Sequence, residues 1–216
     1  HCVFGVDRNP MALELCKLAL WLESVEPGRP LGFLDAHLRC GDALLGVHDL
    51  SVLRAGIPNE AFAPLKNVLA DSGIAGQWVD DREFGSALRR RNAGERAKPT
   101  LPLAGLNLGI PEELDAVLAR LSSDDQGLAD VEAKRQLFEQ TRADGSLTWR
   151  LLRACDLWTA AFFSVKRPVE RQGRERAPTS DTVWRFLADP SSLAPHIAEE
   201  AEALRRQYRF FHWPLE

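Results

Sequence analysis

The sequence predicts an α/β protein that is mostly helical. Residues 1–46 have the pattern strand, helix, loop, strand, which is typical of a doubly wound α/β sheet. From about residue 51 to 206 the apolar residues recur almost throughout at helical spacing. We therefore expect part of an α/β sheet over 1–50, a domain-sized helical insertion over 51–206, and a return segment over 207–216.

The first strand and helix are predicted from residues 2–22. The apolar run from Cys2 to Val6 ends at Asp7, which indicates a buried strand. Asn9 offers a side-chain oxygen as helix N-cap, and Pro10 suits the first helical position, where no amide donor is needed. The helix is apolar over most of its circumference, so we expect it to pack against the sheet with a face that includes Met11, Leu15, Leu18 and Leu22.

The elements in the rest of the chain are predicted from Pro- and Gly-rich stretches, which interrupt helices and strands, and from the spacing of apolar residues. His37 to Cys40 predicts a second strand, which ends at Gly41 and Asp42. Residues 98–111 and 166–180 indicate exposed connections, and the second is the better candidate for disorder. We expect three tryptophans (149, 158 and 184) in the core. Helices are expected at 58–71, 80–94, 111–122, 126–143, 147–165, 181–189 and 194–209.

Composition excludes several classes of protein. The formal net charge is −4, which gives no global attraction to nucleic acid or to an anionic membrane. No apolar run approaches the ~20 residues of a membrane span. The four cysteines are far apart, and neither they nor the five histidines form the closely spaced pairs of a structural zinc site. These patterns favour a cytoplasmic protein with reduced thiols, no metal and no membrane partner.

Two carboxylates follow the two predicted strands. In a nucleotide-binding α/β fold, an acid at the carboxyl end of the second strand accepts hydrogen bonds from the ribose hydroxyls of a cofactor, which suits Asp7. Asp42 follows Gly41, where backbone can approach a ligand closely, and an acid there can accept from the exocyclic amine of adenine. Each residue also has a structural interpretation: Asp7 helps to cap the helix, and Asp42 forms an ordinary turn.

Taken in order, these segments resemble a known family. The stretch from Val3 through Leu22, then Pro30–Leu31 with Phe33–Asp35, and then Leu38–Gly46 look like the bifunctional (Type IIG-like) restriction–modification and phage-exclusion class of N6-adenine DNA methyltransferases. The closing residues Phe211–Glu216 are similar to the element that precedes the catalytic Asn-Pro-Pro-aromatic motif there. The resemblance covers roughly the first 46 residues and the last few. The helical middle matches loosely.

The resemblance implies part of a class I (Rossmann-like) methyltransferase sheet that binds S-adenosylmethionine. Asp7 would bind the ribose, Asp42 would approach the adenine, and Arg8 and Asn9 would line the adenosine pocket. The parent protein would methylate adenine N6 in DNA, within a restriction–modification or phage-defence system. No catalytic residue is assigned here, because the resemblance places the Gly-rich motif before residue 1 and the Asn-Pro-Pro-aromatic motif after residue 216. We therefore expect an internal fragment that alone neither methylates nor binds cofactor well.

Two other functions are compatible with the sequence. Asp7 would serve equally in another dinucleotide-binding Rossmann enzyme, reading a nicotinamide or flavin ribose, and a GxGxxG loop upstream would favour that alternative. The chain would otherwise be a non-catalytic helical scaffold or DNA-binding module. Clusters of Arg and Lys occur at 89–98 and 166–176, but acidic residues lie among them and near them, which indicates mixed-charge surfaces.

Overall fold

A computed structural model describes residues 4–24, 34–63, 81–101, 112–121, 123, 127–167 and 176–216. They belong to two compact units, which are described separately. The first comprises His1–His48, Gly109–Leu152 and Arg209–Glu216, and the second comprises Asp49–Leu108 and Arg153–Tyr208. The expected insertion over 51–206 is thus divided, because residues 109–152 group with the strands. Within the described residues, no helix combines the length and the apolar character needed to cross a membrane.

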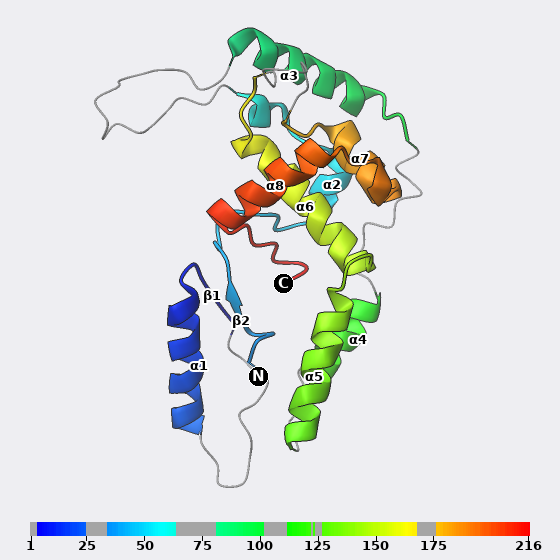
Figure 1. Ribbon diagram of the computed structural model, residues 1–216. Helices are drawn as coiled ribbons and strands as arrows, with labels where there is room; N and C mark the ends of the chain where they lie inside the picture. Colours follow the sequence, from blue (N-terminus) through cyan, green and yellow to red (C-terminus); the bar gives the residue numbers. More distant parts are fainter. Residues whose placement is uncertain are drawn as a thin grey trace, which may run out of the picture. The chain divides into compact units, whose positions relative to one another are not determined.

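The first unit contains a two-stranded parallel sheet. Strand β1 (Gly5–Asp7) pairs with β2 (Leu38–Cys40) in the register Gly5↔Leu38, Val6↔Arg39 and Asp7↔Cys40. Hydrogen bonds continue past each end of the pair, since the Gly5 amide donates to the residue before β2 and the Asp7 carbonyl accepts from the residue after it. The structure has a strand at both predicted places, but the first is not buried as expected, because Phe4 is 67% exposed and no residue of β1 is fully buried. The two strands lie next to each other, with helix α1 beside them (Figure 1).

Helix α1 (Pro10–Ser24) begins where the sequence predicts, with the Asn9 side chain accepting from the Met11 amide at 3.0 Å. The expected packing face is wrong. Leu13 is buried, whereas the exposed fractions of Met11, Leu15, Leu18 and Leu22 are 64%, 60%, 49% and 61%. The reason is geometric: within the described residues two strands of three residues lie beside this 15-residue helix, so they cover only one side of it and about 10 Å of its roughly 22 Å length.

The remainder of the first unit comes from distant parts of the chain. It contains α4 (Glu112–Leu121), α5 (Leu128–Thr141) and the first turn of α6 (Leu147–Phe163). We call residues 210–216 the tail. Phe210 forms a parallel bridge with Asp42, next to the end of β2, and the following amide donates to the Leu45 carbonyl at 2.9 Å. The tail therefore returns to the sheet.

The second unit is helical and has its own core, which includes the fully buried Leu53, Ile57, Phe62 and Trp184. Trp184 is 1% exposed and its indole donates to the Leu53 carbonyl at 2.8 Å, so its predicted place in the core is confirmed, whereas Trp149 and Trp158 are only half-buried. Besides the rest of α6, its elements are α2 (Ser51–Ala55), the 3-10 helix η1 (Asn59–Phe62), α3 (Arg82–Ala97), α7 (Ser180–Ala188), the 3-10 helix η4 (Pro190–Ser192) and α8 (Pro195–Tyr208).

Six of the seven predicted helices correspond to helices of the structure, whereas α2 (Ser51–Ala55) and the short η4 (Pro190–Ser192) were not predicted. The helix expected at 58–71 is a short 3-10 turn over Asn59–Phe62, after which Ala63 is extended, and residues 64–71 lie outside the described residues. The two expected exposed connections are described only in part. The second of them is not exposed at its ends, because Lys166 and residues 177–180 are buried.

A buried hydrogen-bond network explains why the start of α7 is not on the surface. The Asn92 side chain, fully buried on α3, donates to the Ile57 carbonyl at 2.7 Å and accepts from the Ser180 amide at 2.9 Å. The Ser180 hydroxyl also donates to Asn92 and accepts from the Ile57 amide. Buried polar groups require such partners, so this network fixes α3 and α7 against the loop before η1.

We predict that Asn92→Ala lowers the free energy of unfolding by about 2–3 kcal/mol, because it leaves buried partners without hydrogen bonds. Ser86→Ala, on the exposed side of the same helix, should change it by less than about 0.5 kcal/mol. Urea denaturation of the two variants checks this, and equal midpoints would contradict a structural role for the network.

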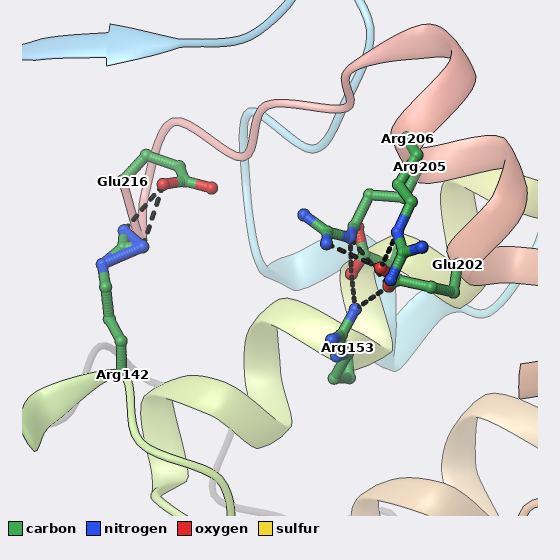
Figure 2. A network of polar contacts seen from close by, with 7 residues as sticks. Arg142, Arg153, Glu202, Arg205, Arg206 and Glu216 are labelled. Atoms are coloured by element: carbon green, nitrogen blue, oxygen red, sulfur yellow. Dashed lines mark hydrogen bonds and ion pairs between the residues drawn. The ribbon is translucent and has the colours of Figure 1, made fainter. Parts of the chain in front are cut away.

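A charged cluster joins α6 and α8 in the second unit. The Glu202 carboxylate accepts hydrogen bonds from Arg153, Arg205 and Arg206, as Figure 2 shows. The hydrogen bond from Arg205, aided by that from Arg153 and opposed by burial, lowers the pKa of Glu202 to about 2. Because three guanidinium groups share this carboxylate, its ionised form stabilises the packing of the two helices.

This cluster predicts acid sensitivity. The pKa of Glu202 in the folded chain is below its ordinary value of 4.5, so its contribution is complete above about pH 5 and is lost as the pH falls toward 2. Glu202→Gln should cost about 1–2 kcal/mol at pH 7, with solvent screening taken into account, and close to nothing at pH 2. Glu199→Gln, at an exposed position of α8, is the control. A difference from wild type that stays constant across this range would contradict the assignment.

Candidate functional site

The carboxyl ends of β1 and β2 meet at one edge of the sheet. Asp7 ends β1 and is paired with Cys40, and Asp42 lies two residues beyond β2. The Arg8 guanidinium lies 3.4 Å from the Asp42 carboxylate, so the residues that follow the two strands are in direct contact. Parallel pairing thus brings together Asp7, Arg8 and Asp42, three of the four residues that the sequence analysis proposed.

Each carboxylate also has a structural partner. Asp7 Oδ1 accepts from the Asn9 amide at 2.6 Å, and Asp42 Oδ1 accepts from the Leu44 amide at 3.0 Å. These are the local turns that the structural interpretation expects of Asp residues. The Asn9 side chain, the fourth proposed residue, caps α1. The turns orient both carboxylates, and Asp42 Oδ2 faces Arg8.

Arg209 is a residue of this edge that the sequence analysis missed. Its carbonyl accepts from the Asp42 amide at 2.6 Å, and its guanidinium donates to the Cys40 sulfur at 2.9 Å. Its backbone has φ = 56°, the left-handed conformation in which helices often end. Glycine is the usual residue there, and no local pattern around an arginine signals the conformation, which explains why the sequence analysis did not find it.

The tail fixes the turn that carries Asp42. A Cβ atom on Gly46 would lie 1.8 Å from the Phe211 carbonyl oxygen, so glycine is required where the tail crosses. His212 Nδ1 accepts from the Val47 amide at 3.0 Å, and the Trp213 indole donates to the Ala43 carbonyl at 3.0 Å. The position of the Asp42 carboxylate therefore depends on residues at the far end of the sequence.

No protein-family model, curated protein or solved structure matches this chain. Within the described ranges, no three His, Cys, Asp or Glu side chains gather closely enough to hold a metal ion. What this edge offers a ligand is two carboxylates and two arginines at the carboxyl ends of two parallel strands.

We predict that Gly46→Ala dislodges the tail, because the added methyl group would overlap the Phe211 carbonyl. Hydrogen exchange should then accelerate at the amides of Asp42 and Phe211, and the melting temperature should fall. Gly94→Ala on α3 is the matched control, because nothing lies within 4 Å of its added methyl group. A helical Gly→Ala change of that kind stabilises a protein by about 0.5–1 kcal/mol. Unchanged exchange in Gly46→Ala would contradict the crossing.

Proposed function

We propose that this chain is part of an S-adenosylmethionine-dependent DNA adenine-N6 methyltransferase of a restriction–modification or phage-defence system. The observation that carries the proposal is the shared edge: Asp7 and Asp42 follow neighbouring parallel strands, and Arg8 reaches from one to the other. The resembling stretches contain the two strands, α1 and the turn after β2. The tail, which also resembles the family, lies against that turn.

In this proposal the chain's own residues bind and orient the cofactor's nucleoside. The exposed Asp7 carboxylate accepts hydrogen bonds from the ribose diol, and Asp42 accepts one from the adenine amine. Arg8 must release Asp42 for this to happen. The Arg8 side chain is 60% exposed and lies 3.4 Å from the Asp42 carboxylate, so it can move into solvent while Asp42, which is 14% exposed, keeps its hydrogen bond from the Leu44 amide.

S-adenosylmethionine supplies the methyl group, and the resemblance assigns the groups that hold the target base to a motif after residue 216. DNA is the proposed substrate by the same resemblance. The net charge of −4 gives this chain no general attraction for DNA, so the proposal assigns to these residues the cofactor and not the duplex.

One observation favours the scaffold alternative. Both carboxylates make local turns through Oδ1, which is all that a structural role requires of them. In the methyltransferase function the remaining carboxylate oxygen of each residue binds the cofactor, and in the scaffold function it binds none. Measurements of cofactor affinity and of thermal stability therefore distinguish the two functions.

The test is made on the longer protein that the resemblance implies, by titration calorimetry with S-adenosylmethionine and by transfer of labelled methyl groups to DNA. We predict that Asp7→Ala raises the cofactor dissociation constant about 10–100-fold, because charge-assisted hydrogen bonds contribute about 1.5–3 kcal/mol. Asp7→Asn keeps an oxygen for the turn and loses the charge, so it should show an intermediate loss of affinity.

Asp49→Ala is the control, because Asp49 makes the same kind of turn with the Ser51 amide, at 2.9 Å, in the second unit. It should leave the cofactor affinity unchanged. An Asp7→Ala protein with a lower melting temperature and wild-type cofactor affinity would support the scaffold function and remove Asp7 from the cofactor site.

A further inference from the structure

The first unit contains a pocket of about 410 Å³ between the strands, α4, α5 and the tail. Ligand pockets in proteins typically have volumes of about 300–1,000 Å³ and are mainly apolar, with a few polar groups. None of Asp7, Arg8, Asn9 and Asp42 lines this pocket, so it is separate from the proposed cofactor edge. Its apolar lining includes Phe4, Val6, Val117, Leu121, Phe138 and Leu215.

Three charged side chains lie in this apolar lining: Arg39 from β2, Arg142 after α5, and Glu216 in the tail. Glu216 Oε2 accepts from Arg39 at 2.8 Å and from Arg142 at 2.7 Å (Figure 2 shows the second pair). Both guanidinium groups also lie over the Phe138 ring, at 4.8 and 4.9 Å from its centroid. Two cations therefore share one aromatic ring and one carboxylate.

The charges of this pocket do not balance. Burial lowers the pKa of Arg142, Glu216 opposes this effect, and the positive charge of Arg39 adds to it. Arg39 Nε is buried and finds no hydrogen-bond acceptor in the described part of the chain. Two guanidinium groups that share one carboxylate in an apolar environment are only partly neutralised, and a second anion would complete the neutralisation.

We propose that this pocket binds a small organic anion with a planar apolar body and one negative charge. The body packs against the apolar lining of Val6, Val117, Leu121 and Leu215, and the anionic group joins Glu216 at the two guanidinium groups. The ligand thereby brings the charge of the pocket to zero. This inference does not depend on the proposed methyltransferase function, because it uses different residues.

The test uses this chain with its C-terminal carboxyl group amidated, so that no α-carboxylate lies beside the Glu216 side chain. Two probes of nearly equal shape, naphthalene-2-carboxylate and the neutral 2-naphthalenemethanol, are compared by titration calorimetry. We expect saturable binding of the carboxylate at one site, with an affinity at least about tenfold higher than that of the alcohol, which corresponds to about 1.4 kcal/mol. Equal affinities, or no saturable binding of the carboxylate at millimolar concentration, would overturn the proposal.

Two variants locate the site. Val117→Trp fills the pocket and should abolish binding of the carboxylate, with far-ultraviolet circular dichroism to verify folding. Glu216→Gln removes the internal competitor for the arginines and should tighten binding of the carboxylate several-fold, so the proposal stays testable if Val117→Trp does not fold. Glu14→Gln, on the exposed surface of α1, should change nothing. Unaltered affinity in folded Val117→Trp or in Glu216→Gln would refute the location.

Discussion

The Phe211 carbonyl passes through the space that a side chain at position 46 would need. This crossing places the tail against the turn after β2, and the other contacts of the tail follow from it. It brings the Arg209 carbonyl to the Asp42 amide and His212 Nδ1 to the Val47 amide, and it places the Glu216 carboxylate at the two arginines of the pocket. Both the proposed cofactor edge and the anion pocket thus depend on one glycine.

The sequence predicted those features that depend on neighbours along the chain. The first strand follows from an apolar run, and the start of the first helix follows from Asn9 as its cap and Pro10 as its first residue. Most of the later helices follow from the spacing of apolar residues. The meeting of Asp7 and Asp42 at one edge was also predictable, because the carboxyl ends of neighbouring parallel strands lie together, but the ion pair between Arg8 and Asp42 was not. The functional meaning of that edge stays a prediction.

The features that sequence analysis missed depend on distant partners. Arg209 and Glu216 acquire their roles from residues near the other end of the chain, and neither has a local signature. The burial of Lys166 was missed because its charge indicated a surface position. The apolar face of α1 shows the converse error, since periodicity reports which side of a helix is apolar but not whether enough sheet is present to cover it.

The order of the two units along the sequence has a consequence for biosynthesis. The Val47 amide and its acceptor His212 are separated by 165 residues, and the segments of the second unit lie between them. All of the second unit is therefore synthesised before the tail can pack against the turn after β2. Until then that turn lacks its partners from the tail. Because contacts between such distant residues form slowly, completion of the first unit is the step most exposed to misfolding and to capture by chaperones.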